Sequence, residues 1–139
     1  MDRVRDFVNM YCRWVEDRLT EDEKWEELAF FELGIDLGVR QGELLSIKWN
    51  QIDYPYIKNI RILKPNSADD YYPPKEISYS TMKILNMLQN NNEFVFTKDI
   101  VKMIESIRKS IGDNQFSGHM MRKFKIALKR VNLEEDDLT

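Results

Sequence analysis

The chain has 139 residues, of which 42% are hydrophobic and 32% charged, so one globular domain is expected and disorder of the whole chain is excluded. It contains no run of eighteen apolar residues and opens on MDRVRDFVNMYCRW, which carries acidic and aromatic residues from the start, so neither a membrane span nor a signal peptide is predicted, and a cytoplasmic location is expected. Cys12 is the only cysteine, which excludes an internal disulfide and a cysteine-based zinc site, and no cofactor or metal is expected.

The net charge of −3 hides a division along the chain. Residues 1–36 carry a net charge of −6 and residues 37–97 a net charge of +1, whereas residues 98–131 carry +6. Residues 132–139 form an acidic tail with four acids and no base. A basic segment between acidic ends indicates a local anionic ligand, although the average charge by itself argues against a nucleic acid.

Three helices are predicted in the first part of the chain. Apolar residues at three- and four-residue spacing predict an amphipathic helix over residues 3–18. Thr20 begins a capping box that predicts the start of a second helix, which continues to Leu37, where Gly38 supplies a left-handed C-terminal cap. A short third helix is expected over residues 41–48.

The middle of the chain is typical of a small β-structure. Tyr54-Pro55-Tyr56 interrupts any helix, and β-favouring residues over 57–63 and again over 75–79 predict a hairpin. The connection between these stretches, residues 64–74, is rich in turn-forming residues. A further short strand is indicated at residues 94–96.

Helices are predicted again in the second half. Ser80 is expected to cap a helix that ends near Gln89, and further helices are expected over residues 98–110 and 119–130, the last with a basic face. This order predicts an α+β fold that is mainly helical, with helices around a small antiparallel β-hairpin or three-stranded sheet, in a single domain over residues 1–139. Large aromatic side chains expected in the hydrophobic core are those of Phe7, Trp14 and Phe30.

The only histidine, His119, lies three residues before Arg122 at the start of the last predicted helix. At this spacing both side chains lie on one helix face, so an imidazole and a guanidinium can reach the same ligand. An arginine offers a bidentate fork to phosphate, and a helix N-terminus adds backbone amides. The alternative is a solvated basic face with a surface histidine, and the spacing alone does not decide between the two.

A second cluster surrounds Arg40, which follows the helix-ending Gly38 at the start of the next predicted helix. This position holds the arginine near a corner of the fold. Glu43, three residues later, can pair with Arg40 or cap the helix. The alternative interpretation is a structural Arg–Glu pair at a helix corner.

Together, the two clusters resemble the boxes of the tyrosine recombinases, the lambda-integrase and Xer-type family. The stretch 37–53, in which Gly38-Val39-Arg40 precedes Glu-Leu-Leu and then a tryptophan, resembles the first arginine box of that family. The stretch 117–122, Ser-Gly-His-Met-Met-Arg, resembles its His-x-x-Arg box. A predicted hairpin lies between the boxes, as in the family, and the resemblance covers residues 5–130.

The resemblance implies a site that binds the scissile phosphate of DNA. Arg40 and Arg122 would clamp this phosphate, and His119 would lie beside them as a hydrogen-bond donor or an acid–base group. Glu43 would orient Arg40 rather than contact DNA. Fixed cations suit this chemistry, because attack on a phosphodiester develops negative charge that must be stabilised in place.

The resemblance also assigns a role to a lysine of the hairpin, which would protonate the leaving 5′-oxygen. Lys64 is the expected candidate, and Lys75 is a weaker one. Further basic residues are expected to attract the DNA backbone without regard to its sequence. These DNA-binding residues are Lys75, Lys123, Lys125, Lys129 and Arg130.

The sequence departs from the family's pattern after Arg122. The family has a third box and then a nucleophilic tyrosine, but all six tyrosines of this chain precede Arg122. We therefore expect a C-terminally truncated recombinase catalytic domain that binds double-stranded DNA and does not cleave it alone. A non-enzymatic DNA-binding regulator of recombinase-like fold and a helical protein-interaction module with structural arginines are the alternatives. Other recombinase protomers are further candidate partners, and no membrane is expected.

Overall fold

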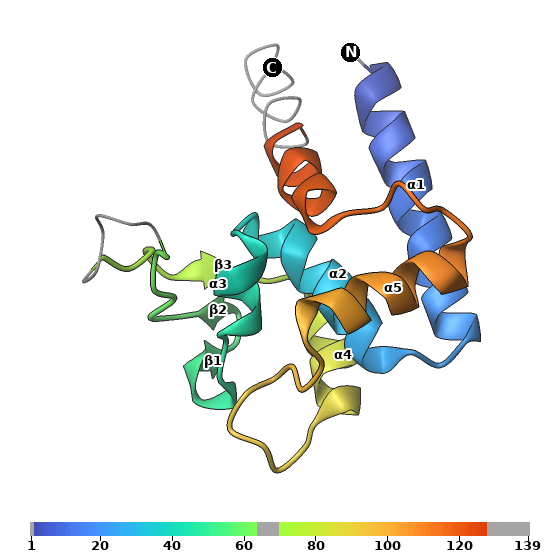
Figure 1. Cartoon of the computed structure of the whole chain (residues 1–139). Coiled ribbons are helices and arrows are strands. Elements are labelled where there is room, and N and C mark those ends of the chain that lie inside the picture. Colours follow the sequence, from blue (N-terminus) through green and yellow to red (C-terminus); the bar gives the residue numbers. More distant parts are fainter. Residues whose placement is uncertain (1, 64–69, 128–139) are drawn as a thin grey trace.

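A computed structural model of the chain describes residues 2–63 and 70–127, and the side chains of residues 3–63 and 70–127. The fold is mainly helical, with a small three-stranded antiparallel sheet at one side of the helices (Figure 1), which confirms the predicted fold class. The elements are α1 (Asp2–Glu21), α2 (Trp25–Leu37), α3 (Gln41–Leu45), the 3-10 turn η1 (Trp49–Gln51), β1 (Ile52–Asp53), β2 (Tyr56–Ile57), β3 (Lys75–Glu76), α4 (Tyr79–Leu88), α5 (Ile100–Ile111) and a final helix described over residues 118–127.

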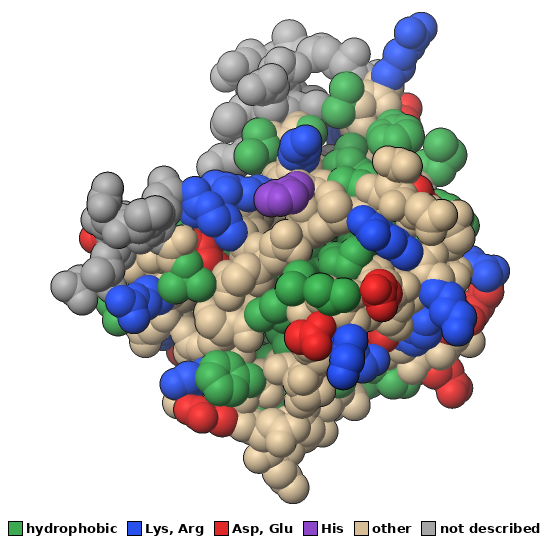
Figure 2. Space-filling model, viewed as in Figure 1, with side chains coloured by type: hydrophobic (Ala, Val, Ile, Leu, Met, Phe, Trp, Pro, Cys, Tyr) green, Lys and Arg blue, Asp and Glu red, His purple; other side chains and the backbone are tan. Residues whose placement is uncertain are grey.

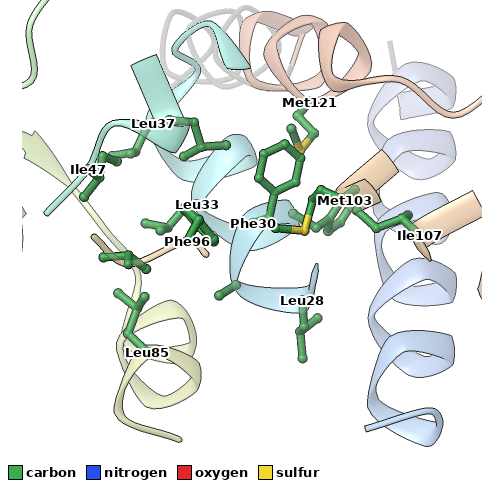
Figure 3. Packing of buried hydrophobic residues seen from close by; sticks show 14 of the residues in the cluster. Leu28, Phe30, Leu33, Leu37, Ile47, Leu85, Phe96, Met103, Ile107 and Met121 are labelled. Atoms are coloured by element: carbon green, nitrogen blue, oxygen red, sulfur yellow. The ribbon is translucent and has the colours of Figure 1, made fainter. Parts of the chain in front are cut away.

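Helix α2 forms the centre of the fold and contacts α1, α3, α4 and α5 (Figure 1). Because its apolar residues are spread around the whole helix, it needs cover on every side. Figure 3 shows Phe30 and Leu33 of α2 among side chains from the surrounding elements, such as Leu85 of α4 and Met103 of α5. Phe30 is fully buried, which confirms its predicted place in the core.

The boundary between the first two helices differs from the prediction at Thr20. Helix α1 continues through Thr20, whose hydroxyl donates to the carbonyl of Glu16 at 2.6 Å instead of capping a new helix. Tertiary contacts extend α1 by this turn, because Leu19 is fully buried and Nε of Arg18 donates to the carbonyl of Ser110 on α5 at 3.1 Å. These contacts outweigh the local capping signal.

The third helix is shorter than predicted. It stops before Ile47, whose carbonyl accepts the N–H of Val95 at 3.0 Å, and Lys48 forms a β-bridge with Phe94. Since the backbone at these positions pairs with a distant segment, the helix cannot continue to Lys48. The strand predicted at residues 94–96 is reduced to this bridge.

The sheet begins earlier in the chain than predicted and is smaller. Strands β1 and β2 form a tight antiparallel hairpin in which Ile52 lies opposite Ile57, and β3 pairs with β2 so that Lys75 also lies opposite Ile57. Beyond β2, the stretch predicted as a strand makes only an isolated bridge between Arg61 and Tyr71. The turn residues of the β1–β2 connection include a proline, whose fixed φ favours this early reversal.

Helices α4 and α5 begin at side-chain caps. Ser78, and not Ser80 as predicted, caps α4, because its Oγ accepts the N–H of Thr81 at 3.2 Å. The N–H of Ser78 in turn donates to Asp36 at 2.8 Å, which ties this cap to α2 and ends β3 before the predicted residue 79. Asp99 caps α5 in the same way.

The final helix packs closely against α2 and α3 through two glycines. A Cβ atom on Gly34 of α2 would lie 3.1 Å from Cβ of Met121, and a Cβ atom on Gly118 would overlap the side chain of Gln41. Only glycine permits an approach as close as this. The start of the final helix therefore lies beside the start of α3.

Two aromatic residues of α1 contradict the prediction that they belong to the core. Phe7 is 54% exposed and Trp14 is 41% exposed. The N-terminal end of α1 extends past the other described helices (Figure 1), which leaves Phe7 partly uncovered, whereas Trp14 lies further along α1 and contacts the ring of Tyr11 from an exposed position. Helical spacing identifies an apolar face, but it does not determine which element covers that face.

Candidate functional site

Arg40 lies at the corner between α2 and α3, where Gly38 ends α2 with a φ of 64°. Arg40 is the N-cap residue of α3, and its backbone N–H donates to Oε1 of Glu43 at 2.8 Å. Its Nη1 lies 3.5 Å from Oε2 of the same carboxyl group, and the side chain is 35% exposed. Pairing and capping, the two contacts that the sequence left open, are both present, and they hold the guanidinium at the surface.

The carboxyl group of Glu43 is fully buried and has further hydrogen-bond donors. The backbone N–H of Leu63 and the hydroxyl of Tyr72 each donate to it at 2.8 Å. Burial alone would raise the pKa of Glu43, but the hydrogen bonds from Arg40, Leu63 and Tyr72 and the charge of Arg40 outweigh burial and lower the pKa. Glu43 therefore stays ionised and joins α3 to two segments outside it.

Tyr72 is a member of this site that the sequence analysis missed. Its backbone N–H donates to the carbonyl of Ile60 at 2.9 Å, which fixes its place beside Glu43. Burial, followed by the hydrogen bond to Glu43 and the charge of that residue, raises the pKa of Tyr72, whereas the charges of Arg40 and Arg122 oppose this shift. No sequence signal points to Tyr72, because it lies in a turn-rich stretch and its partner is 29 residues away.

Arg122 reaches the same place from the final helix. Its charge acts on Tyr72 together with that of Arg40, and the contact of Gly118 with Gln41 brings the start of its helix to α3. His119 is exposed one helical turn before the half-buried Arg122. Figure 2 shows lysine and arginine side chains on both sides of the histidine on this face.

Lys75 also belongs to this group. It is half-buried in β3, and its Nζ lies 4.9 Å from the ring centroid of Tyr72. We call Arg40, Glu43, Tyr72, Lys75 and Arg122 the Tyr72 cluster. The other candidate for the hairpin lysine, Lys64, lies outside the described residues, as do Lys129, Arg130 and the acidic tail.

The two remaining predicted DNA-binding lysines differ in their surroundings. Lys123 is exposed. Lys125 is half-buried, and its Cγ lies so near Gly38 that a Cβ atom on that glycine would be 2.7 Å away. Lys125 thus packs its aliphatic stem against the corner that carries Arg40.

The charges and hydrogen-bond donors of the cluster suit an anionic ligand. The ammonium group of Lys75 lies over the ring of Tyr72, the charges of Arg40 and Arg122 act on the pKa of Tyr72, and the carboxylate of Glu43 is buried and engaged by hydrogen bonds. A guanidinium that is held in place by a buried partner can offer its remaining N–H groups to a phosphate without first being ordered. The exposed imidazole of His119 can add a further hydrogen bond near neutral pH.

Residues 2–63 and 70–127 lack two other kinds of feature. They hold no group of three or more histidine, cysteine, aspartate or glutamate side chains placed to bind a metal ion. None of the helices described there is both long enough and apolar enough to cross a membrane.

Of the comparisons with known proteins, the one with solved structures shows a similarity. No protein-family model matches the chain, and no curated protein matches its sequence. Among solved structures, the chain is similar to XerA recombinase, with a TM-score of 0.64 and 20% identity over 82% of this chain. The match spans 46% of the XerA recombinase chain, so this chain covers about half the length of that protein. The described fold is therefore a recombinase-like fold.

Proposed function

We propose that this chain binds double-stranded DNA in the manner of a tyrosine recombinase and holds one backbone phosphate between Arg40 and Arg122. The observation that carries the proposal is that the start of the helix that bears Arg122 packs against α3 at Gly118 and Gln41, while buried Glu43 fixes Arg40 at the N-terminus of α3. The similarity of the fold to XerA recombinase supports the same conclusion. Recombination of DNA is the process in which such a module would take part.

His119 and Lys75 complete the proposed phosphate site. His119 donates a hydrogen bond to a phosphate oxygen from the exposed face of the final helix. Lys75 approaches from β3, where its ammonium group lies over the ring of Tyr72. Lys123 adds attraction to the DNA backbone that does not depend on base sequence.

Binding without strand cleavage is the expected behaviour of this chain on its own. The resemblance to the tyrosine recombinases implies a nucleophilic tyrosine after the His-x-x-Arg box, and the six tyrosines of this chain all precede Arg122. Tyr72 lies in the site, but its hydroxyl donates to Glu43, and its raised pKa disfavours the phenolate that an attack on phosphorus needs. Within this chain, Arg40 and Arg122 would clamp the phosphate, and Tyr72 would not attack it.

The proposal is tested by measuring the affinity of the full chain for a duplex oligonucleotide over a range of salt concentrations. Arg40→Ala and Arg122→Ala should each weaken binding at least about tenfold and reduce the slope of log affinity against log salt by about one. Arg13→Ala is the matched control, since it removes the same charge from an exposed position on α1. Equal affinities for all four proteins would refute the proposal.

A further inference from the structure

A hollow of about 500 Å³ lies next to the Tyr72 cluster. Its walls come from alternate parts of two segments and from two aromatic residues: Ser46, Lys48, Asn50, Gln51, Asn59, Arg61, Leu63, Tyr71 and Phe94. Leu63 belongs to this wall, and its backbone N–H donates to Glu43 at 2.8 Å. Leu63 therefore links the hollow to the Tyr72 cluster, so a DNA strand held at the arginines would pass close to the hollow.

Two aromatic rings line the hollow and are accessible to solvent. Phe94 is 41% exposed and Tyr71 is 56% exposed. Each is presented by a fixed backbone, because Phe94 forms a β-bridge with Lys48 and Tyr71 forms one with Arg61. The two rings thus offer flat apolar surfaces to a ligand. The backbone segments that carry them are already ordered, so ligand binding has no cost of ordering them.

The same walls carry positive charge. Nζ of Lys48 lies 5.5 Å from the ring centroid of Phe94, and Arg61, which also lines the hollow, is exposed. Among the described residues that line the hollow, none is acidic. Lys48 pairs with Glu93 at 3.0 Å, but both side chains are well exposed, and such a surface pair is weak enough to yield to a phosphate.

Three side-chain amide groups line the hollow, and only that of Gln51 is hydrogen-bonded to the described part of the chain. Gln51 donates from Nε2 to the carbonyls of Lys58 and Asn59, at 3.1 and 2.8 Å, and so holds the turn in place. The side chains of Asn50 and Asn59 are exposed and make no hydrogen bond to the described part of the chain. They are therefore free to pair with the polar edge of a ligand.

We propose that this hollow seats one unstacked nucleobase of the bound DNA. The base stacks on Phe94 and Tyr71, its edge pairs with Asn50 or Asn59, and the neighbouring phosphates lie toward Lys48 and Arg61. The inference rests on the proposed function, because the strand that supplies this base is the one held at Arg40 and Arg122.

The composition of the hollow favours this occupant over two others. A fully paired duplex presents only phosphates and base edges, which do not stack on aromatic rings. Every unstacked base has an exposed face that can stack on the rings of the hollow. A purely apolar ligand makes no use of cations and free amides. The volume of the hollow lies within the range of about 300–1,000 Å³ that is usual for small-molecule sites.

The experiment compares two duplexes that are identical except that one carries a single unpaired 2-aminopurine nucleotide. The wild-type chain should bind the bulged duplex roughly fivefold or more tightly than the paired one, and the 2-aminopurine fluorescence should fall as the base stacks. Phe94→Ala and Tyr71→Ala should reduce this preference while leaving the affinity for the paired duplex within about twofold. Phe94→Leu, which keeps apolar volume but loses the flat ring, should reduce it as well.

Tyr79→Ala is the matched control, because Tyr79 is also an exposed ring with a lysine above it, Lys83 at 5.5 Å, but lies outside the hollow. This variant should keep the full preference for the bulged duplex. Equal affinity for the two duplexes, or a preference that survives Phe94→Ala and Tyr71→Ala, would overturn the inference while leaving the proposed function intact.

A third probe, a single-stranded oligonucleotide with one 2-aminopurine, separates the two proposals completely. Quenching of this probe that depends on Phe94, without binding of the paired duplex, would support the hollow and refute the phosphate clamp. Failure of the chain to bind any of the three probes would refute both.

Discussion

The hydroxyl of Tyr72 donates a 2.8 Å hydrogen bond to Oε1 of Glu43, a carboxyl group that solvent does not reach. The same carboxyl group accepts the backbone N–H of Arg40 and pairs with its guanidinium. Lys75 covers the other part of Tyr72, the aromatic ring. The position of Arg40 at the corner between α2 and α3 thus depends on Tyr72, which lies in the segment between β2 and β3.

Replacing Tyr72 with phenylalanine removes only the hydroxyl. The buried carboxylate of Glu43 then loses one of its donors, so the Tyr72→Phe variant should lower the free energy of unfolding by about 1–2 kcal/mol. Urea unfolding at pH 7 measures this loss. DNA affinity should fall less than in Arg40→Ala, because the guanidinium keeps its own contact with Glu43. An unchanged stability would mean that the hydrogen bond contributes nothing to holding the site.

The ionised state of Glu43 predicts a dependence of stability on acid pH. Its pKa is lowered in the folded chain, so its contribution is present above the ordinary carboxyl pKa and is lost as pH falls through the lowered value. Glu43→Gln should cost about 2–4 kcal/mol at pH 7, because an amide cannot accept from all the donors that the carboxylate accepts from.

The decrease in stability at acid pH, here called the acid limb, tests Glu43→Gln more directly than the loss of stability at pH 7 does. Unfolding free energies measured between pH 7 and pH 3 should fall less steeply for Glu43→Gln than for the wild type. Glu76→Gln, an exposed change in β3, should leave the limb as it is. An acid limb with the same slope in all three proteins would show that Glu43 is not the titrating group.

Two helix-ending glycines provide a matched pair. Gly38 and Gly112 have φ values of 64° and 69°, so alanine at either position is strained by about 1–2 kcal/mol. A Cβ atom on Gly112 meets nothing within 4 Å, whereas one on Gly38 would lie 2.7 Å from Cγ of Lys125. Gly38→Ala should therefore be the more destabilising change in thermal unfolding, and it alone should weaken DNA binding, because it pushes Lys125 and the final helix away from the corner of Arg40.

Equal losses of stability in the two glycine variants would contradict this account. They would mean that the backbone strain is the whole effect, and that the final helix is free to shift away from Gly38 without cost.

A pair of carboxyl groups between α1 and α2 predicts the opposite pH dependence. Burial, a hydrogen bond with Glu16 and the charges of Glu16 and Asp36 raise the pKa of Glu32 to about 9. The folded chain therefore binds a proton that the unfolded chain releases, so stability should decrease as pH rises from 4.5 toward 9. Glu32→Gln stays neutral in both states and should lessen this decrease, as measured by urea unfolding at pH 6, 7, 8 and 9.

Glu105→Gln is the control for Glu32, because Glu105 is an exposed glutamate on α5. This variant should follow the wild-type pH profile. A Glu32→Gln variant whose profile also matches the wild type would show that Glu32 is ionised in the folded chain.

Local sequence signals predicted the corner that carries Arg40. A glycine with positive φ ends α2, and a glutamate at the third position of α3 reaches back to the N-cap residue, as the spacing of Gly38, Arg40 and Glu43 implies. These features depend on residues within one or two helical turns. The helical elements and the presence of a small sheet followed from the same kind of local pattern.

Features that depend on distant partners could not be predicted in this way. Thr20 has a good local capping signal, but α1 passes through it because Leu19 and Arg18 are held by other parts of the fold. The exposure of Trp14 and the place of Tyr72 likewise depend on elements far away in the chain. Periodicity and spacing carry no information about such partners.

The central claim is that Arg40 and Arg122 bind one and the same phosphate, and a double-mutant cycle tests it directly. The affinity of the wild type, Arg40→Ala, Arg122→Ala and the double variant for one paired duplex would be measured at fixed low salt. Because two groups on one ligand atom are coupled, the loss in the double variant should be smaller than the summed losses of the single variants by more than about 0.5 kcal/mol. Losses that add within that margin would contradict the shared phosphate site.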